Sequence, residues 1–134
     1  MRLSAARLCL FLCGLTLSSP AWPTTKVITQ CGKASWYELT GTTASGERAN
    51  PDSLHAAHRS LPFGTNVTVR NLRNGKTLTV RINDRGPFVK GRVIDVTREA
   101  ARRLGFKGRG LTQVEVTAEV PAGYLPKRPF KCPN

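Results

Sequence analysis

Residues 66–83 read NVTVRNLRNGKTLTVRIN, and this stretch decides the fold class. Apolar side chains occupy alternate positions on both sides of an Asn74-Gly75 pair, at Val67 and Val69 before it and at Leu78, Val80 and Ile82 after it. Alternation with a period of two is typical of a strand with one buried face. Asn-Gly between two such runs is the strongest short hairpin signal. The stretch therefore predicts a β-hairpin.

Shorter elements of the same kind flank the hairpin on both sides. Further strands are expected at 34–37, 93–96 and 114–118, and residues 40–50 are rich in Gly, Thr and Ser and predict a loop. A short helix is expected over 98–104, with Thr97 as its N-cap and Gly105 at its C-terminal side. Residues 121–134 contain four prolines and predict an extended tail. Many short strands with one or two short helices indicate an all-β fold, a small closed barrel.

The N-terminus has the pattern of an export signal. Arg2 and Arg7 supply a positive segment, Leu8 to Leu17 is apolar, and Ser19 and Ala21 are small residues that suit a cleavage site. We expect cleavage after Ala21, so that residues 1–21 are a signal peptide. The alternative is a short N-terminal anchor that stays attached.

Cysteine usage agrees with export. Cys9 and Cys13 lie in the expected signal, which leaves Cys31 and Cys132 near the two ends of residues 22–134, a single expected domain. A lone pair in an oxidising compartment predicts a disulfide, with two free thiols as the alternative. No metal site is expected, because the chain has no C-x-x-C or H-E-x-x-H spacing.

The chain is strongly basic. Its formal net charge is +13, from 21 Lys and Arg against 8 Asp and Glu, and removal of Arg2 and Arg7 leaves +11. Such a surface favours polyanionic partners, which include nucleic acid, acidic lipids and acidic wall polymers. Basic residues concentrate over 98–109, and two interpretations are open, a solvated face or a docking face for an anionic polymer. Beyond the N-terminus no apolar stretch is long enough to span a membrane.

Seven sequence blocks resemble those of the rare lipoprotein A family, in the family's order. They are GKASWY (32–37), TASGE (43–47), AAHRSLPFG (56–64), NLRNG (71–75), RINDRGPF (81–88), GRVIDV (91–96) and AARRLG (100–105). The resemblance covers residues 32–120. It implies a six-stranded double-psi β-barrel, the fold shared by expansins and barwin-like proteins.

The resemblance also implies a function. It points to an endolytic peptidoglycan lytic transglycosylase that cleaves glycan strands to 1,6-anhydro-MurNAc ends. Such an enzyme is expected to be exported to the periplasm or cell envelope, or secreted, and to work as a monomer on peptidoglycan, without cofactor, metal or nucleic acid. The chain departs from the family pattern at Glu38, Ala49 and His55.

Asp84 is the first candidate for the catalytic acid and base. Cleavage of a glycosidic bond needs a proton donor for the leaving oxygen. In a lytic transglycosylase one group can serve as acid and then as base, because the sugar's own 6-hydroxyl closes on C1. Asp84 ends a strongly alternating strand and precedes Arg85-Gly86-Pro87. The alternative is a structural aspartate that pairs with Arg85 or caps the turn.

Other residues are expected to assist Asp84. Glu47, in a Gly-containing loop, is the second catalytic candidate, against an ordinary exposed loop carboxylate. His58 is expected to bind substrate, since the family's matching histidine lines the binding groove. The alternative for His58 is a hydrogen-bonded core histidine. Asp95 lies in an apolar run and is expected to be structural, holding Arg85 or Arg92, with a catalytic role as the alternative.

The remaining substrate-binding candidates are Trp36, Tyr37 and Arg85. The two aromatic side chains could stack on sugar faces, but adjacent strand residues point to opposite sides, so one of the two must point inward. Two further functions stay open beside the enzyme. One is a non-catalytic, expansin-like wall-binding module, and the other is a secreted defence protein of the barwin type.

Overall fold

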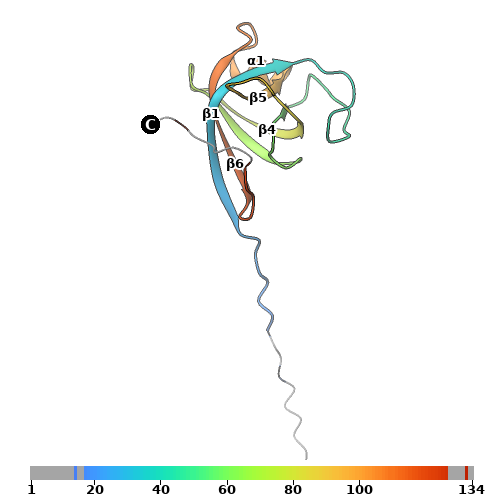
Figure 1. Cartoon of the computed structure of the whole chain (residues 1–134), viewed down its shortest axis with the longest axis vertical. Helices are drawn as coiled ribbons and strands as arrows, with labels where there is room; N and C mark the ends of the chain where they lie inside the picture. Colours follow the sequence, from blue (N-terminus) through green and yellow to red (C-terminus); the bar gives the residue numbers. More distant parts are fainter. Residues whose placement is uncertain (1–13, 15–16, 127–131, 133–134) are drawn as a thin grey trace, which may run out of the picture.

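The computed structural model describes residues 14, 17–126 and 132, and its strands close into one six-stranded barrel (Figure 1). In chain order the elements are β1 (Thr25–Tyr37), β2 (His55–Ala57), β3 (Asn66–Asn71), β4 (Thr77–Asp84), β5 (Arg92–Thr97), α1 (Arg98–Leu104) and β6 (Thr112–Pro121). Around the barrel the order is β1-β5-β2-β4-β3-β6. β1 and β5 are parallel, as are β2 and β4, and the other neighbours are antiparallel. The expected all-β barrel with a short helix is confirmed.

The predicted hairpin is formed by β3 and β4. Val67 lies opposite Val80 and Val69 opposite Leu78, and in β3 buried and exposed residues alternate strictly. The turn is closed by the Asn71 N–H, which donates to the Lys76 carbonyl at 2.8 Å. Gly75 has a φ of +75°, a conformation that costs glycine little. The hairpin supplies four residues of the core, Val67, Val69, Val80 and Ile82.

β1 is longer than the sequence pattern indicated. It begins at Thr25 instead of near Ala34, because Thr25 to Ala34 pair residue by residue with β6. β1 and β6 continue beyond the rest of the barrel as a two-stranded ribbon (Figure 1). The short strand β2 was not anticipated, since three residues are too few to show a period.

Helix α1 begins and ends where the sequence indicated. Gly105 has a φ of +80° and closes the C-terminus, with its N–H bonded to carbonyls of the last turn. The capping role expected for the Thr97 side chain is wrong, because its hydroxyl donates to the Ser53 carbonyl and not to the helix. Ala100, Ala101 and Leu104 face the core.

Cys31 and Cys132 form a disulfide, as expected, across 101 positions. The chain-entropy model assigns a loop of this length about 4–5 kcal/mol of stabilisation. The expected signal peptide falls mostly outside the described residues, and Ser19 and Ala21 are exposed and have no regular structure. Of the predicted tail, residues 121–126 and Cys132 are described, and the Tyr124 hydroxyl bonds the Ser60 hydroxyl at 2.8 Å.

Candidate functional site

Strand pairing brings two aspartates to the same part of the barrel. Asp84, at the end of β4, lies opposite Ala57 of β2, and Ala57 also lies opposite Asp95 of β5. Because β2 separates them, the two aspartate backbones are about two strand spacings apart, or roughly 10 Å. A register shift in the β2–β4 pairing advances β4 by one residue at this point, so that Ala57 faces Asp84 instead of Asn83.

The Asp84 carboxylate is held on one oxygen. Its Oδ1 accepts the backbone N–H groups of Ala44 and Arg85, both at 2.9 Å. Its Oδ2 has no hydrogen-bond partner among the described residues. The Ala44 contact also fastens the 43–47 loop over the end of β4, together with the Ser45 N–H, which donates to the Asn83 carbonyl at 3.2 Å. The Asp84 carboxylate is therefore fixed in orientation, and its second oxygen can accept a hydrogen bond from a bound molecule or donate one to it.

Glu47 forms an ion pair at the end of the same loop. Its two oxygens accept both terminal nitrogens of Arg81, at 2.7 and 2.6 Å, and Asn83 Nδ2 donates to it at 3.3 Å. The hydrogen bonds from Arg81 are the main reason that the pKa of Glu47 is lowered to about 2. Glu47 is accordingly ionised at neutral pH and has no proton to donate.

Arg81, Asn83 and His55 were missed by the sequence reasoning. His55 Nε2 lies 3.2 Å from Arg81, and its Nδ1 lies 2.8 Å from the Ser53 hydroxyl. Burial, followed by the charge of Arg81, lowers the pKa of His55. Arg81 lies between the buried residues Val80 and Ile82, and Asn83 is itself buried next to Asp84. Their place in the strand that ends at Asp84 was the one available signal.

Trp36 and Tyr37 are divided between the two sides of β1. Tyr37 is half-buried, and its pKa is raised by burial and by the negative charges of Asp84 and Asp95, so its phenol stays protonated. Trp36 instead packs against the core, and its Nε1–H donates to the Lys107 carbonyl at 3.0 Å. Of the two aromatic candidates the structure therefore brings Tyr37 to the aspartates, and it places Trp36 elsewhere.

His58 lies in the core, not on a surface that a glycan could contact. It is 2% exposed. Its Nδ1 accepts the backbone N–H groups of Ser60 and Leu61, both at 3.1 Å, so Nε2 carries the proton and donates to Gln30 Oε1 at 2.9 Å. Burial, then the charges of Arg85 and Arg59, lower the pKa of His58 to about 4. Its backbone N–H donates to the Asp84 carbonyl, so this position favours the alternative of a hydrogen-bonded core histidine, and substrate binding by His58 stays a prediction.

Arg85 and Asp95 also have structural partners. Arg85 donates to the carbonyls of His58 and Leu61, at 3.2 and 2.8 Å, and lies over the ring of Phe63 at 3.8 Å. These contacts within the fold occupy much of the Arg85 guanidinium group, which the sequence analysis expected to bind substrate. Asp95 pairs with Arg92 at 2.5 Å, as one of its two expected partners, and accepts the Ser35 hydroxyl.

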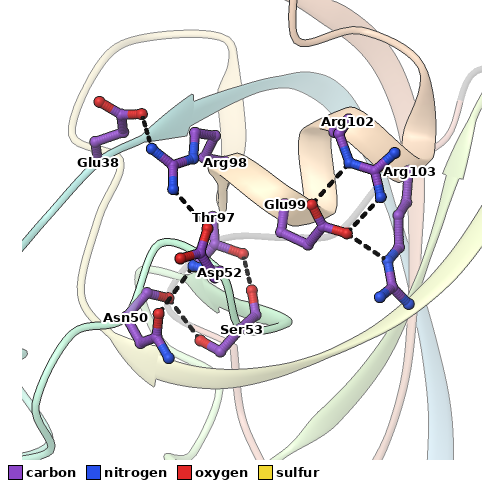
Figure 2. A network of polar contacts seen from close by, with 9 residues as sticks. All are labelled: Glu38, Asn50, Asp52, Ser53, Thr97, Arg98, Glu99, Arg102 and Arg103. Carbon is purple, nitrogen blue, oxygen red and sulfur yellow. Dashed lines mark hydrogen bonds and ion pairs between the residues drawn. The ribbon is translucent and has the colours of Figure 1, made fainter.

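The basic residues of α1 are largely paired with acids (Figure 2). Arg98 bridges Glu38 and Asp52, at 2.7 and 2.5 Å, and so ties the residue after β1 and the loop before β2 to the helix. Arg102 and Arg103 both reach Glu99, at 2.6 and 2.9 Å. The helix is therefore a less cationic surface than its sequence indicated.

Residues 14, 17–126 and 132 contain neither a free metal-binding cluster nor a helix that could span a membrane. Their one group of three side chains close enough to share a metal ion is Cys31, Glu115 and Cys132, and both sulfurs are consumed by the disulfide. Within the same residues, no helix has the length and hydrophobicity of a membrane span.

The chain is similar in sequence to peptidoglycan enzymes. The profile of the family described as "Lytic transglycolase" matches residues 29–116. A protein of Neisseria meningitidis serogroup A named "Endolytic peptidoglycan transglycosylase RlpA" is 45% identical over 101 residues, 73% of this chain and 42% of that protein. The protein of the same name from Rickettsia prowazekii is 43% identical over 114 residues, 81% of this chain and 34% of its own length. The chain spans between a fifth and a half of the curated relatives it matches.

Two solved structures share the fold. The Streptomyces papain inhibitor superposes with a TM-score of 0.58 at 24% identity and covers 69% of this chain and 94% of its own. The apo expansin of Clavibacter michiganensis superposes with a TM-score of 0.56 at 22% identity, over 74% of this chain and 54% of its own. At these identities the likeness concerns the fold alone, and it agrees with the expected double-psi β-barrel.

Proposed function

Since the chain belongs to the lytic transglycolase family of double-psi β-barrels, we propose that it cleaves peptidoglycan glycan strands endolytically and leaves 1,6-anhydro-MurNAc ends. The observation that carries the proposal is the setting of Asp84. One carboxylate oxygen is fixed by two backbone N–H groups and the other has no partner among the described residues. A single acid–base group needs this combination of fixed aim and available oxygen.

The reaction requires one proton to leave Asp84 and one to return. Protonated Oδ2 donates to the glycosidic oxygen while the bond from that oxygen to C1 breaks, and positive charge develops at C1. The resulting carboxylate takes the proton of the 6-hydroxyl group as O6 bonds C1 and closes the anhydro ring. No water is consumed, and Asp84 ends in the protonation state in which it began.

Glu47 is proposed to assist as a fixed negative charge. Its pKa of about 2 keeps it ionised, and Arg81 and Asn83 hold it next to the end of β4. A preorganised carboxylate stabilises the positive charge that develops on the sugar. Tyr37, whose raised pKa keeps its hydroxyl protonated, is proposed to hydrogen-bond the sugar on the Asp95 side of the site.

We place the activity outside the cytoplasm, in the cell envelope. The Cys31–Cys132 disulfide supports this placement, because such bonds persist in oxidising compartments. The N-terminal sequence pattern supports it also, as an export signal that ends at Ala21.

Asp84→Asn tests the catalytic assignment. The amide can still accept both backbone N–H groups through its oxygen, so fold and wall binding should survive, but it cannot donate and recover a proton. Release of anhydro-muropeptides from sacculi, followed by mass spectrometry, should fall roughly 10²–10⁴-fold. Asp52→Asn is the matched control, because it alters an exposed aspartate that pairs with Arg98 on another part of the surface.

Two outcomes would count against the proposal. A well-folded Asp84→Asn protein with full activity would remove Asp84 from the reaction. A wild-type protein that binds sacculi but releases no anhydro product would favour the non-catalytic, expansin-like module instead.

A further inference from the structure

The segment after Asp84 exposes an aromatic side chain. Phe88 is 80% exposed, although it lies four residues beyond the proposed acid, and its neighbour Val89 is 52% exposed. Exposed side chains of this size remain in contact with water at a cost, unless a ligand covers them. None of the roles described above uses Phe88.

Phe88 is exposed although the backbone around it is held in place by hydrogen bonds. Arg59 fastens the segment on both sides of it, through hydrogen bonds from Nε to the Pro87 carbonyl and from a terminal nitrogen to the Val89 carbonyl, the latter at 2.8 Å. The Arg92 N–H also donates to the Val89 carbonyl, at 3.2 Å. The backbone that bears Phe88 is thus fixed to two other parts of the chain, and the ring is presented outward.

The ring also lies close to Asp84. Its edge is 3.7 Å from the point where a side chain on Gly86 would begin, so it rests beside Gly86. Two residues of chain span at most about 7 Å, which limits the distance from Gly86 to Asp84. A ring in this place can meet a sugar next to the one whose bond Asp84 would cleave.

We propose that Phe88 is a sugar-stacking platform that binds a pyranose ring of the glycan strand beside the cleavage position. This inference rests on the proposed function. A pyranose ring has a face of C–H groups, which can cover an aromatic face and remove both from water. Its hydroxyl groups at the rim remain free to meet polar groups.

A glycan fits this surface better than a protein partner does. A stable protein interface takes about 20–30 residues from each side. The exposed apolar residues of this segment are two, Phe88 and Val89. Charged residues flank the segment in the chain, with Arg85 before it and Lys90 after it.

The test compares three substitutions at one position. Phe88→Ala should weaken binding to purified peptide-free glycan strands roughly three- to tenfold, the size expected for one aromatic contact. It should raise KM by a similar factor and change kcat less than twofold. Phe88→Leu should behave like the alanine variant because it keeps apolar area but has no ring face, and Phe88→Trp should retain binding. Leu125→Ala is the matched control, an equally exposed apolar residue in the C-terminal segment.

The results separate this inference from the proposed function. Binding is measured by isothermal titration with inactive Asp84→Asn protein as well as wild type, so the platform can be judged even if no cleavage occurs. Unchanged Kd in Phe88→Ala, or equal losses in the alanine and tryptophan variants, would overturn the platform. A Phe88→Ala effect on binding to anionic lipid vesicles without an effect on glycan binding would overturn it as well.

Discussion

At the scale of single residues, the two carboxylates of the site differ in their contacts. Both carboxylate oxygens of Glu47 accept hydrogen bonds from Arg81, and this pairing holds the pKa of Glu47 near 2. One carboxylate oxygen of Asp84 accepts hydrogen bonds from two backbone N–H groups, and the other has no partner in the described part of the chain. The roles proposed for them, a fixed charge for Glu47 and a proton carrier for Asp84, rest on this difference in partners.

His58 shows how a buried hydrogen-bond pattern selects one protonation state. Two backbone N–H groups point at Nδ1, so a proton on that nitrogen would face two donors. Burial and two neighbouring arginines disfavour the cation further, and the pKa falls to about 4. The neutral imidazole therefore helps to hold the turn that follows it, next to the Asp84 backbone.

The lowered pKa of His58 predicts a loss of stability in mild acid. The unfolded chain binds a proton near pH 6.5 and the folded chain only near pH 4, so the free energy of unfolding decreases as pH falls through this interval. Between pH 7.5 and 4.5 the decrease should be roughly 2–3 kcal/mol, measured by urea unfolding.

His58→Asn should remove most of this pH dependence. The Asn side-chain oxygen can take the place of Nδ1 as acceptor, although the variant is expected to be less stable at pH 7.5. His55→Asn is the comparison variant: the pKa of His55 is also lowered, but this residue is only half-buried, so its replacement should remove less of the pH dependence than that of His58. The assignment fails if His58→Asn keeps the full pH dependence of the wild type.

At the scale of elements, β4 organises the site. Arg81 and Asn83 contact Glu47, Asp84 follows, and the register shift against β2 turns the strand end toward Ala57 and Asp95. The 43–47 loop folds over this strand end because backbone groups of Ala44 and Ser45 bond to it. One strand thus supplies both the proposed acid and the groups that hold its partner.

Helix α1 is tied to the β3–β4 turn at its C-terminus. Asn71 and Asn74 both donate to the Leu104 carbonyl, at 2.9 and 3.0 Å. Gly105 follows in the left-handed conformation, and a Cβ there would lie 2.7 Å from Asn74 Nδ2. The turn of the hairpin and the end of the helix therefore depend on a glycine at this position.

Gly105→Ala should lower the free energy of unfolding by about 1–2 kcal/mol from backbone strain alone, with displacement of Asn74 adding to it. Thermal and urea unfolding measure the loss. Gly108→Ala is the matched control, because nothing lies within 4 Å of its would-be Cβ and its φ is not positive. Equal stability of the two variants would contradict the role given to Gly105.

At the scale of the whole molecule, the excess of positive charge is unevenly neutralised. The arginines of α1 share Glu38, Asp52 and Glu99. Another group of basic residues, Lys33, Arg73 and Arg109, lines a surface hollow of about 450 Å³ with no ion pair among the described residues. These three cations thus differ from the arginines of α1, whose charges are offset by neighbouring carboxylates.

Binding to sacculi should weaken as salt rises, because exposed charges are screened over about 10 Å at 0.1 M salt. Arg73→Gln with Arg109→Gln should weaken binding at low salt more than Arg102→Gln with Arg103→Gln, although both pairs remove two charges. Co-sedimentation with sacculi at increasing NaCl measures both effects. Binding that stays constant to high salt would show that sugar stacking dominates over charge.

The sequence by itself determined the elements whose signals are local. Alternation around Asn74-Gly75 specified the β3–β4 hairpin, and the stop signal at Gly105 specified the end of α1, because both signals lie within or next to a single element. Removal of the expected signal left one pair of cysteines, and that pair forms the disulfide. The ordered motifs also pointed to the family and to Asp84.

Only the tertiary structure decided which residues meet around Asp84. Closure of the barrel brings Ala44 to Asp84 and Glu47 to Arg81 across 40 and 34 positions, and no local pattern encodes such contacts. The same closure buried His58, packed Trp36 against the core and left Tyr37 near the two aspartates. The physical reason is that alternation along a strand shows only that one of its faces is buried. Which side chains meet on either face depends on how strands that are distant in the sequence pair with one another.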